Sequence, residues 1–194
     1  MTTQHPAAEW DHRYREGYGR PEASPLLVEM RHLLPPAGEA LDIATGAGRN
    51  ALYLARLGFR VMGIDFSRVA VKMCLEQARA LGLTIDAILA DLERFPLPTA
   101  RYDLIVTFYY HQRSICPRIE AALKPGGVVV FETYTLEQLH RGFEGGPRDP
   151  DLLLKPGELR GLFPRLQEIY YREGIFDEGH GPKAIASLIA RRPL

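Results

Sequence analysis

The chain has 194 residues, of which 46% are hydrophobic and 25% are charged, and its 24 Lys and Arg residues balance 24 Asp and Glu. This length suits one domain with a full hydrophobic core, and the composition is that of an ordinary soluble globular protein. The balanced charge excludes a strong overall positive field of the kind that attracts nucleic acid or acidic membrane, so we expect a small-molecule partner.

The two cysteines, Cys74 and Cys116, lie too far apart in sequence for the spacing of a zinc site. We expect two buried free thiols in a reducing compartment, and no metal. No apolar stretch approaches the roughly 20 residues of a membrane span. Residues 1–6 do not resemble the start of a secretory signal. The sequence therefore predicts a cytoplasmic protein with no membrane partner.

Three aromatic residues recur near the N-terminus at intervals of four: Trp10, Tyr14 and Tyr18. This spacing places the three rings on one side of a helical segment. That side either packs on the core or closes over a bound cofactor, and both interpretations remain open. Ser24 is then expected to cap a short helix that begins at Pro25.

From residue 40 onward, apolar runs alternate with helical patterns, which predicts parallel strands joined by right-handed crossovers. We expect strands at residues 40–44, 60–64, 84–90, 103–108 and 128–133, and helices at 50–57, 67–81 and 113–123. Two further strands, 166–176 and 184–190, flank the turn-rich segment 177–182, which indicates a hairpin. The predicted fold is a three-layer α/β, doubly wound Rossmann-like sheet of seven strands, mostly parallel, with an antiparallel last strand.

Residues 1–194 are expected to form a single domain, with residues 1–36 as an N-terminal cap region. Residues 136–155 show no clear period and contain three glycines and two prolines. A stretch of this length in a compact domain is usually mobile or functional, so it is a possible lid loop.

The chemistry begins at the glycine turn after the first strand. Gly46 and Gly48 allow a ligand to approach the backbone closely, and the amides that open the next helix can bind an acidic group. Taken alone, this turn also fits the dinucleotide pattern Gly-x-Gly-x-x-Ala. Asp65, at the end of the second strand, can accept both ribose hydroxyls of either kind of cofactor, so it does not separate the two.

Asp42 favours one cofactor over the other. A carboxylate just ahead of the turn repels the diphosphate of NAD, but it suits the sulfonium and ammonium groups of S-adenosylmethionine. Asp91, at the end of the third strand, can accept a hydrogen bond from an adenine amino group. Three acids at strand ends therefore favour S-adenosylmethionine.

The chain resembles the class I S-adenosylmethionine-dependent methyltransferases. The resemblance rests on residues 42–48, Asp65, and residues 91–92, 102–106 and 123–127. Within that class, residues 48–55 and the Trp10-Asp11-x-Arg13-Tyr14 opening are similar to the tellurite-resistance and thiopurine-type small-molecule methyltransferases. The family usually has glycine where this chain has Ala44. We expect the Cβ of Ala44 to hold its backbone at negative φ and to crowd the methionine part of the cofactor.

The resemblance implies a set of cofactor-binding residues: Asp42, Ala44, Thr45, Gly46, Gly48, Asn50, Asp65, Phe66, Asp91, Leu92, Thr107 and Arg13. Arg13 would reach the methionine carboxylate from the N-terminal segment. For Asn50 the alternative is a role at the start of a helix, and Phe66 and Leu92 either pack on the adenine or belong to the core.

Residues 107–113 follow the fourth strand and should face the transferred methyl group, because ligands of open α/β sheets lie beyond the carboxyl ends of the strands. His111 is the candidate general base and Tyr110 a second catalytic candidate, although His111 also suits a structural role. The residues expected at the substrate are Tyr109, Tyr110, His111, Trp10 and Arg148. Arg148 would guide an anionic acceptor under the lid loop, or is simply a solvated charge.

The predicted function is that of an S-adenosylmethionine-dependent methyltransferase acting on a small molecule, as a monomer or homodimer and without a nucleic-acid partner. Two alternatives stay open: an NAD-dependent Rossmann oxidoreductase, and a non-catalytic S-adenosylmethionine-binding module.

Overall fold

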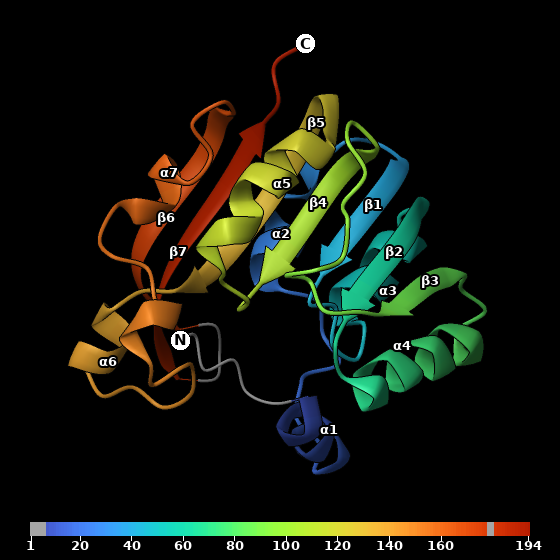
Figure 1. Ribbon diagram of the computed structural model, residues 1–194, viewed down its shortest axis with the longest axis horizontal. Helices are drawn as coiled ribbons and strands as arrows, with labels where there is room; N and C mark the ends of the chain where they lie inside the picture. Colours follow the sequence, from blue (N-terminus) through green and yellow to red (C-terminus); the bar gives the residue numbers. More distant parts are fainter. Residues whose placement is uncertain (1–6, 178–180) are drawn as a thin grey trace.

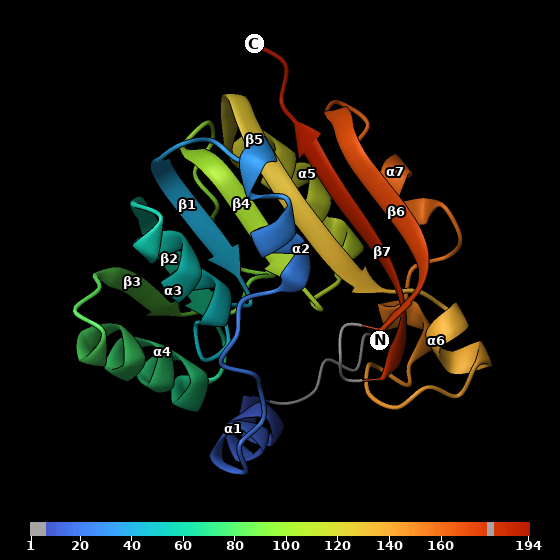
Figure 2. The same cartoon turned by 180° about the vertical axis from the view of Figure 1, so that it is seen from behind.

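The computed structural model describes residues 7–177 and 181–194, which form one seven-stranded sheet with helices on both faces (Figures 1 and 2). The strands are β1 (Gly38–Ile43), β2 (Phe59–Asp65), β3 (Ile85–Leu89), β4 (Tyr102–Phe108), β5 (Leu123–Tyr134), β6 (Gln167–Asp177) and β7 (Pro182–Arg191). Their order across the sheet is β3-β2-β1-β4-β5-β7-β6. Strand β7 runs antiparallel to both of its neighbours, and every other neighbouring pair is parallel.

The helices are α1 (Ala7–Arg15), α2 (Pro25–Glu29), α3 (Arg49–Arg56), α4 (Arg68–Ala80), α5 (Cys116–Ala122), α6 (Glu137–His140) and α7 (Glu158–Gly161). Three short 3-10 segments join them: Arg31–Leu33, Arg113–Ile115 and Pro150–Leu152. Helices α2, α3 and α4 cover one face of the sheet, and α5 and α7 cover the other (Figures 1 and 2).

The core divides into two clusters because side chains alternate across a strand. In β1, Leu41 and Ile43 pack on the side of α5, whereas Ala40 packs on the side of α3 and α4. Asp42 follows the same alternation toward α3 and α4. A carboxylate therefore occupies a buried position of the central strand that an apolar side chain would normally fill.

The predicted fold class is confirmed, with two local differences in the strands and helices. Strand β5 begins at Leu123, ahead of the predicted residue 128, because Gly126 adopts a φ of 80° inside the strand and the pairing with β4 shifts register there. The predicted helix at 113–123 is split into a 3-10 segment and α5. Pro117 lies at the start of α5, where its missing amide hydrogen costs least.

Ser24 precedes α2, but its hydroxyl does not cap that helix as predicted. It accepts a hydrogen bond from Nη2 of Arg49 at 3.0 Å. The hairpin of β6 and β7 is present, with Asp177 paired to Pro182, and the turn residues 178–180 lie outside the described residues.

The segment 136–155, the possible lid loop of the sequence, contains α6 and one 3-10 turn. Buried Gln138 ties it together: the side-chain amide donates to the carbonyls of Glu144 and Gly145, and Oε1 accepts from the amide of Ala184 in β7. This segment is therefore fastened to the strand beside it.

None of the helices in the described ranges has the length and apolar character needed to cross a membrane.

Candidate active site

The glycine turn links the end of β1 to the start of α3, at the carboxyl edge of the sheet. Gly46 and Gly48 have φ values of 57° and 91°, and Gly48 is the residue just before α3. The amide of Thr45 donates to the carbonyl of Ile64 at 3.0 Å, which fixes the turn to β2. A Cβ on Gly48 would lie 2.5 Å from Sγ of Cys74, so α4 packs directly on the turn.

Ala44 departs from the sequence prediction. Its φ is 54°, in the left-handed region, so the expectation that its Cβ holds the backbone at negative φ is wrong. The bends on either side of Ala44 impose this conformation, at a cost of about 1–2 kcal/mol for a residue with a Cβ. The backbone at Ala44 therefore has the conformation that glycine adopts easily, although the residue is alanine.

Asp42 lies beneath this turn with only 2% of its surface exposed. Its Oδ2 accepts a hydrogen bond of 2.7 Å from the hydroxyl of Thr45. Burial raises the pKa of Asp42 to about 7, although the hydrogen bond from Thr45 and the charge of Arg49 oppose the rise. The side chain is therefore poised to gain a charge near neutral pH when a cation approaches.

Asp65 holds the turn from the other side. Its Oδ2 accepts from the amide of Gly46 and its Oδ1 from the amide of Ser67, each at 2.8 Å. Burial raises the pKa of Asp65, while these backbone hydrogen bonds lower it. Each carboxylate oxygen can accept more than one hydrogen bond, so Asp65 retains capacity for the hydroxyls of a ribose.

The remaining predicted cofactor residues differ in their exposure and in their hydrogen-bond partners. Asp91 is exposed, and its Oδ1 accepts from the amide of Glu93 at 2.9 Å. Asn50 is buried, with Oδ1 accepting from the amide of Ser24 at 2.9 Å. Leu92 packs in the core beside Ile64, whereas Phe66 is half-buried.

Helix α1 is fastened next to the turn. Oδ1 of Asp11 accepts hydrogen bonds from the hydroxyl of Ser67 at 2.6 Å and the amide of Val69 at 3.1 Å, so α1 is held at the start of α4. Buried Tyr14 reaches the glycine turn, and its hydroxyl oxygen lies 2.5 Å from where a Cβ on Gly46 would be.

The three rings of the N-terminal stripe contact one another, but α1 ends at Arg15, so the prediction that one helical segment carries all three is wrong for Tyr18. The centroids of Trp10 and Tyr18 are 5.2 Å apart, and those of Tyr14 and Tyr18 are 5.6 Å apart. Arg13 donates to Glu9 at 2.8 Å and lies over the ring of Trp10 at 4.9 Å. The stripe thus packs beside the glycine turn, and Arg13 is engaged within α1 itself.

His111 is buried against Phe131, with ring centroids 6.1 Å apart. Neither ring nitrogen has a hydrogen-bond partner among the residues that the structure describes. Burial lowers the pKa of His111 to about 4, the charge of Arg113 adds to this, and Glu158 opposes it. The imidazole is therefore neutral at pH 7, with a ring nitrogen able to accept a proton.

The neighbours of His111 in sequence have other contacts. The Tyr110 hydroxyl donates to Oε1 of Gln112 at 2.6 Å. Thr107, at the end of β4, is buried, and its hydroxyl donates to the carbonyl of Tyr110 at 3.4 Å. Arg148 is exposed on the segment that precedes the last 3-10 turn.

Tyr109 belongs to a group of residues that the sequence analysis did not bring together. Its ring lies 5.0 Å from that of Tyr134, 4.9 Å from Nζ of Lys183 and 5.8 Å from the guanidinium of Arg49. Nζ of Lys183 also donates to the Tyr109 hydroxyl at 3.2 Å. We call Arg49, Tyr109, Tyr134 and Lys183 the tyrosine–cation cluster. Tyr109 is a predicted substrate residue, but the sequence contains no signal that links it to Lys183 or Tyr134.

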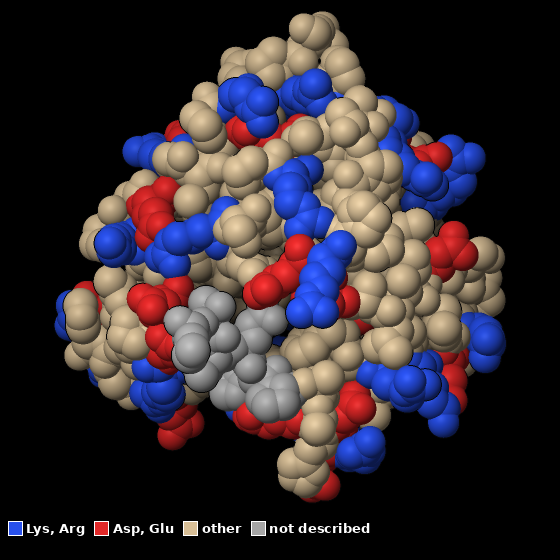
Figure 3. All heavy atoms as spheres, viewed as in Figure 1, with Lys and Arg blue, Asp and Glu red and all other residues tan. Residues whose placement is uncertain are grey.

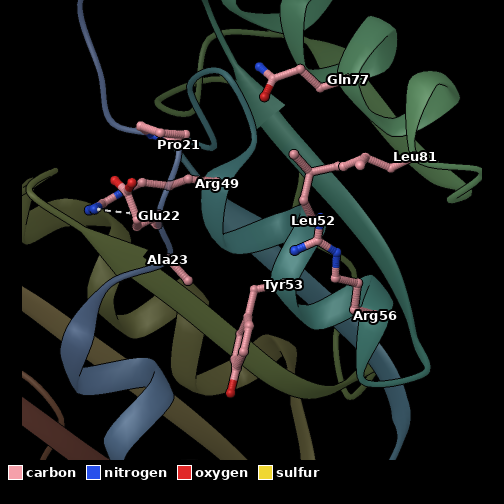
Figure 4. Close-up of a pocket in the computed structure, with 9 residues that line it drawn as sticks. All are labelled: Pro21, Glu22, Ala23, Arg49, Leu52, Tyr53, Arg56, Gln77 and Leu81. Atoms are coloured by element: carbon pink, nitrogen blue, oxygen red, sulfur yellow. Dashed lines mark hydrogen bonds between the residues drawn. The ribbon is translucent and has the colours of Figure 1, made fainter.

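A surface hollow of about 310 Å³ lies on the outer side of α3 (Figure 4). Arg49 lines one end of it and donates to the carbonyl of Glu22 at 3.5 Å. None of the three strand-end acids lines this hollow, but Gln77 in its lining donates to the carbonyl of Ala47 at 3.1 Å, so the hollow adjoins the glycine turn. Within the described ranges, no three His, Cys, Asp or Glu side chains gather in a way that could hold a metal ion.

Comparison with known proteins shows that part of this chain is similar to methyltransferases. Residues 40–127 match the model of a methyltransferase domain. The ribosomal protein L11 methyltransferase of Thermus thermophilus is 30% identical over 57% of this chain and 44% of its own length. The ubiquinone biosynthesis O-methyltransferase of Nitrosococcus oceani is 31% identical over 64% of this chain and 56% of its own length. The chain thus spans about half the length of these curated relatives.

Solved structures agree on the fold. TehB from Haemophilus influenzae superposes with a TM-score of 0.75 at 19% identity, covering 94% of this chain and 67% of TehB. The [4+2]-cyclase SpnF superposes with a TM-score of 0.68 at 21% identity, covering 87% of this chain and 79% of SpnF.

The sheet order, the turn between two buried acids and the match of residues 40–127 to a methyltransferase domain make this chain similar to the class I S-adenosylmethionine-dependent methyltransferases. In fold it is similar to TehB. S-adenosylmethionine is the cofactor of the class. The residues present fit it, because Asp65 retains acceptor capacity for ribose hydroxyls and Asp42 offers a carboxylate to a cationic group.

Proposed function

We propose that this protein transfers the methyl group of S-adenosylmethionine to a small molecule. The observation that carries the proposal is the pair of buried acids, Asp42 and Asp65, on either side of the glycine turn. Asp65 takes the ribose hydroxyls, and Asp42 lies beneath the cationic end of the cofactor. Tyr14, whose hydroxyl lies at Gly46, contributes a further polar group from α1.

The bound cofactor supplies an electrophilic methyl group on a sulfonium. In the transfer, the acceptor atom forms a bond to the methyl carbon, the carbon–sulfur bond breaks, and its electron pair stays on sulfur. A neutral acceptor also loses a proton. The work of the protein is to align the two molecules, to exclude water and to take up that proton.

His111 is the residue proposed to take the proton. Its ring is neutral at pH 7, so one ring nitrogen carries a lone pair, although burial lowers the pKa to about 4 and thereby weakens it as a base in the cofactor-free protein. Tyr109 and Tyr110 follow the end of β4 and would line the acceptor site, while Thr107, within β4, is proposed to contact the cofactor. Trp10 and Arg148 are proposed to approach the acceptor from α1 and from the segment 136–155.

A small acceptor is favoured over RNA or protein by the charge of the chain. Curated relatives include a ribosomal RNA methyltransferase and ribosomal protein methyltransferases as well as the ubiquinone enzyme. Binding to RNA normally requires a basic surface. On the face in Figure 3, Lys and Arg are interspersed with Asp and Glu, and the formal net charge of the chain is zero.

The buried free thiols of Cys74 and Cys116 favour a reducing, cytoplasmic location, and we propose a monomer or homodimer. The methyltransferase match favours S-adenosylmethionine over the NAD alternative. The non-catalytic module is the second candidate, because a fold alone does not determine a reaction, and one neighbour in fold is named for a reaction other than methyl transfer.

The experiment that tests methyl transfer uses S-adenosylmethionine labelled in its methyl group and a panel of small metabolites, read by mass spectrometry. We expect label in at least one acceptor, and S-adenosylhomocysteine formed in equal amount. His111→Phe should reduce transfer to a neutral acceptor by about 100-fold or more, while cofactor binding is retained. Cofactor binding without transfer to any acceptor would overturn the enzymatic proposal in favour of the binding module.

A further inference from the structure

The tyrosine–cation cluster lies where the acceptor of a methyltransferase domain would be bound. Tyr109 follows β4, Tyr134 is the last residue of β5, and Lys183 lies near the start of β7. Tyr134 pairs with Ile185, so the ends of β5 and β7 are adjacent. Strands β4 and β5 point to the same edge of the sheet (Figure 1), the edge at which open α/β sheets bind ligands.

Tyr109 is held in a conformation that a bulky residue rarely adopts. Its φ is 59°, and its amide donates to the carbonyl of Glu132 at 2.8 Å. The left-handed region costs about 1–2 kcal/mol for a residue with a Cβ, and such strain tends to occur at functional sites. With this backbone conformation, the Tyr109 ring lies near two cations and beside Tyr134.

Both cations of the cluster lie against the same ring. Lys183 is only 8% exposed, whereas the side chain of Lys72 on α4 is 74% exposed. Burying an ammonium group costs free energy that an exposed lysine avoids. Arg49 brings a second positive charge to the ring, and it also influences the pKa of Tyr134 and of Asp42. Arg49 is therefore the member of the cluster whose charge also acts on the buried acid Asp42.

The buried acid nearest in sequence to Tyr134 has a cation of its own. Oε2 of Glu132 accepts from the hydroxyl of Ser187 at 2.7 Å and from Nη2 of Arg172 at 3.2 Å. This network crosses from β5 to the neighbouring strands β7 and β6. Arg172 thus forms an ion pair with Glu132, whereas Lys183 and Arg49 both lie near the ring of Tyr109.

We infer that the methyl acceptor is an aromatic carboxylate, whose ring packs on Tyr109 and Tyr134 and whose carboxylate is held by Lys183 and Arg49. This inference rests on the proposed function, since it names the class of acceptor for that site. Flat tyrosine rings suit an aromatic body, and charge-assisted hydrogen bonds from an ammonium and a guanidinium suit a carboxylate.

Benzoate and its neutral analogue benzamide test the inference directly. Each is titrated into the full chain saturated with S-adenosylhomocysteine, and binding is followed by NMR. We expect benzoate to bind about tenfold more tightly than benzamide, the difference made by one charge-assisted contact. Equal binding of the two compounds by the wild-type protein would overturn the inference without any variant.

Two substitutions locate the site. Lys183→Met keeps the length of the side chain and removes its charge, so the preference for benzoate should fall to about twofold or less. Lys72→Met removes the same charge from the outer surface of α4 and should leave the preference unchanged. A Lys183→Met protein that melts like the wild type and still prefers benzoate tenfold would contradict the assignment.

The first step separates this inference from the proposed function. If S-adenosylhomocysteine does not bind to the wild-type protein, the proposed function fails before benzoate is added. If S-adenosylhomocysteine binds and benzoate is not preferred, the inference about the acceptor fails and the proposed function stands.

Discussion

The backbone amide of Gly46 donates a hydrogen bond of 2.8 Å to Oδ2 of Asp65, so the acid that ends β2 holds the turn that follows β1. The same carboxylate accepts from Ser67 at the start of α4. One buried side chain therefore fixes the relative position of two strands and a helix at the proposed cofactor site. Substitutions near this carboxylate should affect folding and cofactor binding together.

Ala44→Gly is expected to stabilise the protein by about 0.5–1 kcal/mol. The substitution removes the cost of a Cβ at a φ of 54°, and the greater freedom of glycine in the unfolded chain offsets part of the gain. Urea unfolding measures the change. Ala55→Gly, within α3, is the matched control and should destabilise the protein by about 1 kcal/mol. A loss of stability in Ala44→Gly would contradict the backbone path of the turn.

Gly46→Ala is expected to destabilise the protein by about 2–4 kcal/mol, from a strained φ and a contact with Tyr14. The added Cβ would lie 2.5 Å from the hydroxyl oxygen of Tyr14 but 3.4 Å from the ring carbon that carries it. Tyr14→Phe should therefore recover part of the loss. A double-mutant cycle measures this coupling, and strictly additive effects would show that Tyr14 does not lie against Gly46.

The raised pKa of Asp42 should make the free energy of unfolding of the cofactor-free protein depend on pH. Its pKa is about 7 in the folded protein and close to 3.8 in the unfolded chain, so the folded state binds the proton more tightly. The resulting stabilisation is complete below pH 4 and is lost as the pH rises through 7, by up to about 4 kcal/mol. Asp42→Asn should remove this loss, while Asp86→Asn on the exposed side of β3 should retain it. Parallel curves for wild type and Asp42→Asn would refute the prediction.

The lowered pKa of His111 should make the free energy of unfolding depend on pH in the opposite direction, at lower pH. Burial lowers its pKa to about 4 from 6.5, so the folded state binds the proton less tightly than the unfolded chain. Its contribution to stability is present above pH 6.5 and is lost as the pH falls through 4, by up to about 3 kcal/mol. His111→Phe should be less sensitive to acid over this interval in chemical unfolding. His140→Phe, at an exposed histidine, is the control.

Much of the fold could be predicted because parallel strands leave a strong pattern. Continuous apolar runs, interrupted by glycine turns, located each strand within a few residues. The same logic brought Asp42 and Asp65 together, since β1 and β2 are neighbours that end at one edge. The left-handed φ of Ala44 was not predictable, because the surrounding turn imposes a conformation that alanine itself disfavours.

Contacts between distant segments account for the rest of the site. Lys183 and Tyr109 are 74 positions apart, and only the antiparallel insertion of β7 beside β5 brings them together. Similarly, the amide of Ser24 occupies Oδ1 of Asn50 from 26 positions away. Neither contact has a local signal in sequence, because tertiary packing and not periodicity creates it.

The central claim is that Asp65 binds the ribose of S-adenosylmethionine at the glycine turn, and calorimetry tests it most directly. Wild-type protein should bind S-adenosylmethionine with a dissociation constant in the micromolar range or below, and Asp65→Ala should weaken binding at least about tenfold through the loss of charge-assisted hydrogen bonds. Asp86→Ala is the matched control and should bind like the wild type. Unchanged affinity in a folded Asp65→Ala protein would contradict the account.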